Sequence, residues 1–478
     1  MSHSATTSDH VELRRGAYAD SVTLLQVSRD VQQTPGVVTA QVAMATPLNV
    51  DVLTGMGFTV PEASPNDLVV AVRMAGDGEL DRALAAVDAA LAATTRRTGG
   101  SAELAPPRTT AAALREAPNG LVLVSVPGPS ALVEAMDALD AGRDVMVFSD
   151  HVPLDQERAL KRVASERDLL VMGPDCGTAV VGGLGLGFAN VTSPGPVGIV
   201  AASGTGCQQL LALLDHAGVG VSSALGVGGR DLSADVRGLS TRTALARLDQ
   251  DPGVELILLV SKPPADEVAT EISTYAESLA TPVELALLGP GEPDLTASAE
   301  AVLRRLGRDV PAWPVAGVVS TSSTTEGQEA TGRQIRGLFV GGTLKNEAEL
   351  IVADAIGVDG GHTFVDFGAD EYTSGRAHPM IDPTLRLEHL VRVAEDQQTG
   401  VVLLDVVLGH GAEPDPAALL APAVADFEVP VVIAVVGTAH DPQDLDRQVR
   451  VLAEAGAEVH LSNAGATRRA IELVGGAA

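Results

Sequence analysis

The sequence of 478 residues contains few aromatic, cysteine and lysine residues. Because aromatic residues make up only 2 % of it, the buried core must be built mainly from Ala, Val and Leu, which suit buried parallel strands. The two cysteines, Cys176 and Cys207, exclude a disulfide framework. Of the 32 basic residues only Lys161, Lys262 and Lys345 are lysines.

Positive charge and long apolar runs are also scarce. The formal net charge of −30 excludes a general nucleic-acid binder, because that function needs a basic surface. No apolar run approaches the roughly 18 residues that span a bilayer, and the polar start Met1–His10 lacks the apolar core of a signal peptide. We therefore expect a cytoplasmic protein that has neither a nucleic-acid partner nor a membrane partner.

Three common site signatures are missing. The two cysteines are far apart and no pair of histidines at zinc-binding spacing accompanies them, so no metal site is predicted. Neither the Walker A loop nor the Gly-x-Ser-x-Gly nucleophile motif occurs. The sequence therefore excludes the P-loop type of nucleotide site and a serine-hydrolase elbow.

The pattern of apolar runs predicts an α/β protein of four segments. Residues 1–100 alternate strands and helices in the manner of a ferredoxin-like α+β module. Residues 108–190 alternate short apolar strands with helices, which is typical of a Rossmann-like parallel sheet. Residues 195–310 and 333–478 share one order of strand, glycine loop, helix and buried strand, so we interpret them as two homologous flavodoxin-like domains.

Each of these two domains opens with a glycine-rich loop between a strand and a helix. The first loop predicts phosphate binding by Ser203, Gly204, Thr205 and Gly206 ahead of a helix over 207–217, because free N–H groups and the helix dipole attract anions. The second loop places Gly341, Gly342 and Thr343 ahead of a helix over 346–356. Ligands bind at such sheet edges, although a tight turn without a ligand has the same pattern.

Two further glycine loops are candidates for lining a substrate cleft. Residues 173–179 follow a strand and contain Asp175 and Cys176, and residues 226–231 contain Gly229 and Arg230. The Arg230 guanidinium could form a fork onto a phosphate or carboxylate. The alternatives are a structural turn between domains and an ion pair of Arg230 with a nearby acidic residue.

A long polar segment, Asp366–Asp382, interrupts the last domain. Long ordered loops often carry function, so we take Arg376 as a clamp for a substrate carboxylate and His378 as the group that exchanges a proton with a leaving amide nitrogen. In this hypothesis catalysis lies at a cleft shared by the two repeated domains. The alternative is that both side chains pin the segment to a partner chain.

Several of these runs resemble a known family. Gly173-Pro-Asp-Cys, Val197-Gly-Ile-Val-Ala-Ala-Ser-Gly-Thr and Leu225-Gly-Val-Gly-Gly-Arg-Asp are similar to runs of the succinyl-CoA synthetase α subunit. Over nearly the whole chain the sequence resembles the FdrA family of acyl-CoA-synthetase-like proteins, through the runs Met172-Gly-Pro-Asp-Cys-Gly-Thr-Ala, Leu186-Gly-Phe-Ala-Asn, His378-Pro-Met-Ile-Asp and Val436-Gly-Thr-Ala-His-Asp-Pro-Gln. The resemblance implies that 108–190 is a CoA-binding-type domain and that 195–310 and 333–478 are succinyl-CoA synthetase-like domains.

Two features depart from the synthetase. Its phosphorylated histidine would fall in the run 286–294, which reads Ala-Leu-Leu-Gly-Pro-Gly-Glu-Pro-Asp and has no histidine. Its opening glycine fingerprint for CoA is replaced by the N-terminal module. A phosphohistidine relay along the synthetase's path is therefore not expected.

The FdrA resemblance implies a subunit of an oxamate carbamoyltransferase in ureide (allantoin) catabolism, converting oxalurate and phosphate to oxamate and carbamoyl phosphate. Phosphate would be a co-substrate, the organic substrate a small acid or ureido compound, and other subunits of the pathway the partners. The alternative is an acyl-CoA ligase that uses CoA and a nucleotide. A non-catalytic scaffold that binds a metabolite is a second alternative.

Overall fold

A computed structural model describes residues 7–75, 79–97, 107–117, 119–319 and 334–475. The chain forms two compact units. The N-terminal unit comprises Met1–Ala105 together with Phe367–Leu385, and the main unit comprises Pro106–Asp366 together with Arg386–Ala478. The polar segment that was predicted to interrupt the last domain therefore belongs, from Phe367 onward, to the N-terminal unit.

The N-terminal unit is a ferredoxin-like α+β fold built on an antiparallel sheet of strand order β1-β3-β2. β3 lies in the middle, and its first five residues are buried because both neighbouring strands and the helices cover them. β1 was not predicted, because it is polar and partly exposed at the sheet edge. The elements are β1 (Thr7–Arg14), α1 (Ser21–Gln32), β2 (Val37–Met44), α2 (Pro47–Gly55), β3 (Leu68–Ala75), α3 (Leu80–Arg97) and α12 (Asp370–Thr373).

The main unit begins with a small parallel sheet of order β4-β5-β6. Its core consists of short Val strands and the Ala-rich inner face of α5. The predicted helix over Leu154–Glu166 is confirmed to the residue. The elements are α4 (Thr110–Glu116), β4 (Val122–Val124), α5 (Gly128–Asp140), β5 (Val145–Val147), α6 (Leu154–Glu166) and β6 (Val171–Met172).

The first six-stranded sheet has the order β12-β11-β9-β10-β7-β8. The strands β12, β11, β9 and β10 are parallel, and the β7–β8 hairpin joins antiparallel to β10 although it lies within the range 108–190. The elements are β7 (Thr178–Val181), β8 (Leu184–Gly187), β9 (Val197–Ala202), α7 (Gly204–His216), β10 (Val221–Gly226), α8 (Leu239–Asp249), β11 (Leu256–Ser261), α9 (Asp266–Glu277), β12 (Val283–Leu287) and α10 (Leu295–Arg305).

The second six-stranded sheet has the order β13-β18-β17-β16-β14-β15 and is parallel except at β13. β16 and β17 are almost wholly buried, which explains their continuous apolar sequences. The elements are β13 (Val315–Ala316), β14 (Gln334–Phe339), α11 (Gly342–Ile356), β15 (Thr363–Asp366), α13 (Thr384–Glu395), β16 (Thr399–Val407), α14 (Pro416–Ala425), β17 (Val431–Val436), α15 (Leu445–Glu454), β18 (Glu458–His460) and α16 (Asn463–Leu473).

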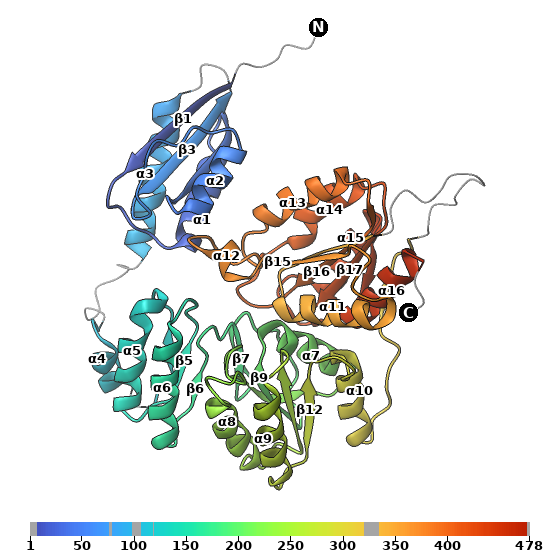
Figure 1. Ribbon diagram of the computed structural model, residues 1–478. Coiled ribbons are helices and arrows are strands. Elements are labelled where there is room, and N and C mark those ends of the chain that lie inside the picture. The colour runs from blue at the N-terminus through green and yellow to red at the C-terminus, as the bar shows by residue number, and fades with distance from the viewer. Residues whose placement is uncertain (1–6, 76–78, 98–106, 118, 320–333, 476–478) are drawn as a thin grey trace, which may run out of the picture. The chain divides into compact units, whose positions relative to one another are not determined.

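A layer of four helices lies between the two large sheets of the main unit. α7 and α10 pack on the first sheet, α11 and α16 pack on the second, and the two pairs contact each other (Figure 1). Both α7 and α11 follow an inner parallel strand, so they begin at the carboxyl edges of their sheets. The layer therefore brings the two predicted glycine loops together.

The helices α7 and α11 begin three and four residues earlier than predicted, at Gly204 and Gly342. Ser203 stops the first helix from extending further, because its backbone is extended and its hydroxyl accepts the N–H of Gly206. The glycines therefore form the first turns of the helices. None of the helices in the described part of the chain combines the length and hydrophobicity that crossing a bilayer requires.

Candidate functional site

The first turns of α7 and α11 touch each other. Ser203 Oγ and Thr343 Oγ1 lie 2.7 Å apart in a hydrogen bond, and both side chains are buried. The backbones approach so closely that a Cβ added at Gly341 would lie 2.8 Å from the side chain of Thr205. The positive ends of two helices therefore lie side by side, and this arrangement favours a negative charge there.

Not every N–H group of the two loops is available to a ligand. Gly206 N donates to Ser203 Oγ at 3.0 Å, and Gly341 N donates to Asp405 Oδ2 at 3.0 Å. The N–H groups of Gly204 and Thr205 come before the first hydrogen bond of α7, which Cys207 N donates to Ser203 O. Gly204 is exposed, and no atom lies within 4 Å of the position that its Cβ would take, so an anion can approach from that side.

A buried ion pair supports the start of α11. Asp405 lies near the carboxyl end of β16 and accepts the N–H groups of Val340 and Gly341 through its two carboxylate oxygens. Arg386 donates to Asp405 Oδ1 at 3.1 Å, and its side chain is only 3 % exposed. Burial raises the pKa of the Asp405 carboxyl to about 6, while Arg386 acts in the opposite direction.

Lys262 and Asp366 reach the first residue of α11. A Cβ at Gly342 would collide with Asp366 Oδ2 and would lie 3.3 Å from Lys262 Nζ, so both side chains reach this position. Within the described ranges Lys262 forms no ion pair. Its ammonium group therefore adds to the positive field of the two helix ends. We call Ser203, Gly204, Thr205, Lys262, Gly342 and Thr343 the paired-helix site.

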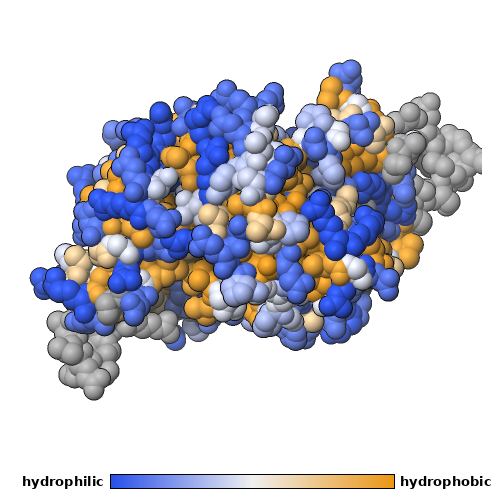
Figure 2. Space-filling view, turned by 90° about the horizontal axis from the view of Figure 1, so that it is seen from below, coloured by the Kyte–Doolittle hydropathy of each residue, from blue (hydrophilic) through white to orange (hydrophobic). Residues whose placement is uncertain are grey.

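Local positive charge matters here because the protein as a whole is strongly acidic. On the face shown in Figure 2 hydrophilic and hydrophobic residues are interspersed, and the net charge of −30 repels anions at long range. Lys262 and the two helix ends supply positive charge at the paired-helix site, beside the carboxylate of Asp366. The arrangement can hold a phosphate or phosphoryl group, which interacts with backbone N–H groups and one ammonium.

The two other glycine loops also lie against each other. Gly173 N donates to Gly226 O at 3.0 Å, and a Cβ at Gly228 would lie 2.6 Å from Pro174 O. Cys176 is buried in this contact, and burial raises the pKa of its thiol to about 12. It is therefore a thiol rather than a nucleophilic thiolate at neutral pH. Its neighbour Asp175 has a left-handed backbone with φ of 55° and donates its N–H to Ser149 O.

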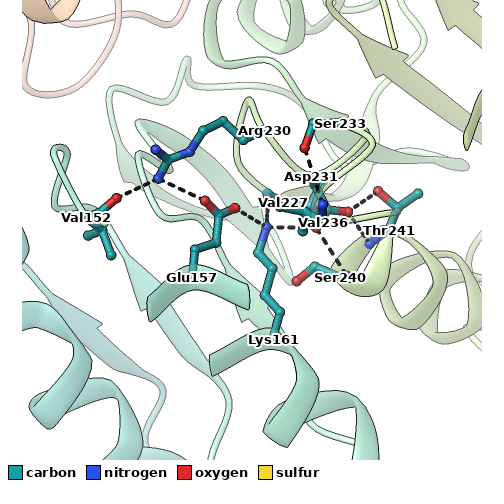
Figure 3. Close-up of polar contacts among 10 residues, drawn as sticks. All are labelled: Val152, Glu157, Lys161, Val227, Arg230, Asp231, Ser233, Val236, Ser240 and Thr241. Carbon is teal, nitrogen blue, oxygen red and sulfur yellow. Dashed lines mark hydrogen bonds and ion pairs between the residues drawn. The ribbon is translucent and has the colours of Figure 1, made fainter. Parts of the chain in front are cut away.

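Arg230 takes part in a buried ion network with Lys161 (Figure 3). Lys161 Nζ, on α6, donates to Glu157 Oε1 at 2.9 Å, Asp231 Oδ1 at 2.7 Å and Val227 O at 2.8 Å, so all three of its protons are used. Arg230 pairs with Glu157 Oε2 at 2.9 Å and keeps 47 % of its side chain exposed. The neighbouring Gly229 is exposed, and no atom is near its Cβ position.

Arg376 and His378 lie in the N-terminal unit. The Arg376 guanidinium donates to Asn49 Oδ1 and Asp382 Oδ2, both at 3.3 Å. His378 Nδ1 accepts the N–H of Met380 at 3.2 Å. Both side chains therefore have structural roles within the segment, and their catalytic roles remain a hypothesis.

Sequence reasoning missed Lys262, Asp405 and Arg386. Lys262 directly follows the buried strand β11, which is the placement that drew attention to the glycine loops. Asp405 is the one charged residue in the run Val401-Val-Leu-Leu-Asp-Val-Val, where an unpaired carboxylate would be very costly. The positions of Lys262 and Asp405 could be recognised in the sequence, whereas the pairing of Asp405 with Arg386 could not.

Part of the chain that carries the paired glycine loops resembles CoA ligases. A family model described as "CoA-ligase" matches residues 338–473, and one described as "AllF, heavy metal-associated domain" matches residues 6–107. The chain is 34 % identical to the uncharacterized protein YahF of Escherichia coli (strain K12), over 93 % of this chain and 95 % of that protein. The chain therefore belongs to the family of YahF.

Two further relatives are α subunits of named ligases. The chain is 28 % identical to the succinate–CoA ligase [ADP-forming] subunit alpha of Methanothermobacter thermautotrophicus, over 36 % of this chain and 58 % of that one. It is 29 % identical to the malate–CoA ligase subunit alpha of Methylorubrum extorquens, over 32 % and 54 %. These matches confirm the resemblance to the succinyl-CoA synthetase α subunit, over little more than half of each relative's length.

Among solved structures, the chain shares 20 % identity and a TM-score of 0.33 with the ATP citrate lyase from Methanothrix soehngenii in complex with citrate and coenzyme A. The match covers 43 % of this chain and 38 % of that one. A TM-score of this size is too low to bear on function.

The N-terminal module does not fit a heavy-metal site. Residues 6–107 contain no cysteine, since the chain's cysteines are Cys176 and Cys207. In the described ranges no group of three or more His, Cys, Asp or Glu side chains is arranged to hold a metal ion. Thiolates are the ligands that soft metals select, so the side chains of this module do not suit a soft metal ion.

Proposed function

We propose that this chain is an enzyme subunit of the acyl-CoA ligase class that holds a phosphate or acyl phosphate at the paired-helix site. The observation that carries the proposal is the 2.7 Å contact of Ser203 with Thr343, because it joins the positive ends of two helices from two different sheets. The CoA-ligase family match and the two ligase α subunits support the same reaction class.

The reaction that suits this site is exchange between an acyl phosphate and an acyl-CoA. The CoA thiolate attacks the acyl carbon, the C–O bond to phosphate breaks, and phosphate leaves with the electron pair. The N–H groups of Gly204 and Thr205 would stabilise the departing phosphate, and Lys262 would neutralise part of its charge. No histidine is required, in agreement with the run 286–294.

Carbamoyl transfer is the second candidate, because it uses a carbamoyl phosphate and also needs no histidine. Oxalurate and phosphate would give oxamate and carbamoyl phosphate at the same anion site. The names of the relatives above support the ligase more strongly. A small carboxylic or ureido acid is the substrate class in both cases, and we propose that a partner chain supplies the nucleotide site, since this chain has no Walker A loop.

The two reactions are separated by assaying the full chain together with any chain that co-purifies with it. The ligase predicts a CoA thioester of succinate or malate, separated by chromatography, when ATP and CoA are both present, and no thioester without CoA. The carbamoyltransferase predicts phosphate-dependent oxamate release from oxalurate. If neither product forms, and calorimetry detects no binding of phosphate or CoA to the chain, the site assignment is wrong.

A further inference from the structure

A small cavity in the main unit lies between the start of α10 and the helices α11 and α16. Its volume is about 220 Å³, and all of its lining residues belong to this one unit. One wall comes from the run 286–294, which has no histidine, and the apolar walls are Leu350, Ile351, Ala355 and Ile471. A cavity of about 150 Å³ can hold benzene, so there is room here for a slightly larger aliphatic molecule.

Glu347 lines this cavity, and within the described ranges no lysine, arginine or histidine pairs with it. The residue is only 1 % exposed, and its two carboxylate oxygens accept the N–H of Leu295 and Asn463 Nδ2, each at 2.7 Å. The buried carboxylate of Asp405, by contrast, has an arginine beside it. Burial raises the pKa of the Glu347 carboxyl to about 7, and the charge of Asp294 acts in the same direction. A carboxyl in this position needs either a proton or a cation from outside the chain.

The other charges that line the cavity leave an excess of negative charge. Asp294 and Arg468 pair with each other at 2.5 Å, so their charges cancel. Glu292 and Asp354 line the cavity too, are exposed to solvent, and form no ion pair in the part of the chain that the structure describes. Together with Glu347 they make three carboxylates without a cation, and such a lining attracts a positively charged ligand.

A hydrogen-bond donor is also missing beside Glu347. Asn463, which holds Glu347 through its Nδ2, has a buried Oδ1 that accepts no hydrogen bond from any described residue. Buried amide oxygens are normally paired, so this atom is an acceptor that still lacks its donor. Charge and hydrogen bonding therefore indicate the same kind of missing group, a cation that carries N–H donors.

We propose that this cavity binds a primary ammonium group on a short aliphatic chain, with the ammonium on Glu347 and the chain against Leu350, Ile351 and Ile471. An ammonium supplies the missing charge and three donors, and the apolar walls remove the chain from water. A simple amine and an amino acid such as leucine both carry this group. Arg468 has N–H groups beyond the one that Asp294 uses, and these can bind the carboxylate of an amino acid. The cavity shares no residue with the paired-helix site, so the inference does not depend on the proposed function.

The test is calorimetry of the full chain with isopentylamine at pH 8, where the Glu347 carboxyl is deprotonated and the amine is protonated. We expect the amine to bind and isopentanol, which has the same carbon skeleton without the charge, not to bind. Glu347→Gln should lower the affinity for the amine about tenfold or more, because a charge-assisted contact is lost. The matched control is Glu349→Gln, the same change on the same helix at a residue that pairs with Lys345, and it should keep the wild-type affinity.

A second variant covers the case in which Glu347→Gln does not fold. Ala355 lines the cavity and is exposed, so Ala355→Leu narrows the cavity, leaves Glu347 in place and should also lower the affinity for the amine. The proposal is overturned if the wild type does not bind isopentylamine, if it binds the alcohol equally well, or if a folded variant of Glu347 or Ala355 keeps the wild-type affinity. Leucine, titrated in the same way, identifies the source of the group: tighter binding that is lost in Arg468→Gln assigns an amino acid, and weaker binding assigns an amine.

Discussion

Ser203 and Thr343, 140 residues apart in the sequence, share a hydrogen bond of 2.7 Å between their hydroxyl groups. Each residue stands at the start of a helix that follows an inner strand of a different sheet. The bond therefore joins the two halves of the main unit at the point where both helix dipoles are positive.

Gly204→Val is expected to weaken phosphate binding and to leave the fold intact. Its Cβ meets no atom within 4 Å, so the side chain would occupy only the open space through which an anion approaches. We expect the affinity for phosphate, measured by calorimetry, to fall about tenfold and thermal stability to change little. The control is Gly55→Val at the end of α2, which is equally unobstructed. Wild-type phosphate affinity in Gly204→Val would contradict the assignment.

Lys262→Met should lower phosphate affinity because it removes the ammonium next to Gly342. A charge-assisted contact contributes about 1.5–3 kcal/mol, which corresponds to a loss of roughly tenfold or more. Lys345→Met is a matched control, since Lys345 lies on α11, the helix that begins at Gly342, and pairs with Glu349. The loss should shrink as salt concentration rises. Equal losses in the two variants would show that only net charge matters.

The buried carboxyl of Glu347 is expected to make the free energy of unfolding depend on pH. Burial raises the pKa of this carboxyl to about 7 from an ordinary 4.5, although Asn463 and the N–H of Leu295 bind it. Between these two values the folded state holds more protons than the unfolded state, so the contribution is complete below about pH 4.5 and is lost as pH rises through 7.

The free energy of unfolding of the wild type relative to Glu347→Gln should therefore fall, on the order of 3 kcal/mol, from pH 4.5 to 7.5. Denaturant titrations of both proteins at several pH values measure it, and the difference cancels the other titrating groups. A difference that is flat across this range would mean that Glu347 titrates normally in the folded protein.

Lys161→Met should destabilise the main unit by about 3–5 kcal/mol, because Glu157 and Asp231 would both remain buried without their cation. Arg230→Gln should cost less than about 1 kcal/mol, since that side chain is half exposed. Chemical unfolding compares the two. If Arg230→Gln keeps its stability but loses turnover, Arg230 binds substrate as the sequence suggested; normal turnover would assign it to the ion network alone.

The local sequence pattern was enough to predict elements that are apolar throughout or along one regular face. The strand that contains Val401–Leu404 is apolar on both faces, and the helix Leu154–Glu166 is amphipathic, so each could be identified without its neighbours. The edge strand β1 was missed because it carries polar side chains, and its pairing with β3 depends on residues about 60 positions away.

The candidate site was predictable in part for the same reason. A glycine loop after a buried strand is visible in the sequence, so Ser203–Gly206 and Gly341–Thr343 were found. Which N–H groups remain available was not visible, because Asp405 takes Gly341 N from another strand. The hydrogen bond of Arg376 with Asn49 could not be predicted either, since Asn49 is more than 300 residues away in the sequence.

Both helix ends of the paired-helix site belong to one polypeptide, in one compact unit. Folding of the chain therefore brings the two helix ends together, and dilution cannot separate them as it separates two subunits. Phosphate affinity should accordingly stay constant while the protein is diluted, whatever other chain takes part in turnover. Any activity that falls on dilution would then report the loss of that other chain rather than the loss of this anion site.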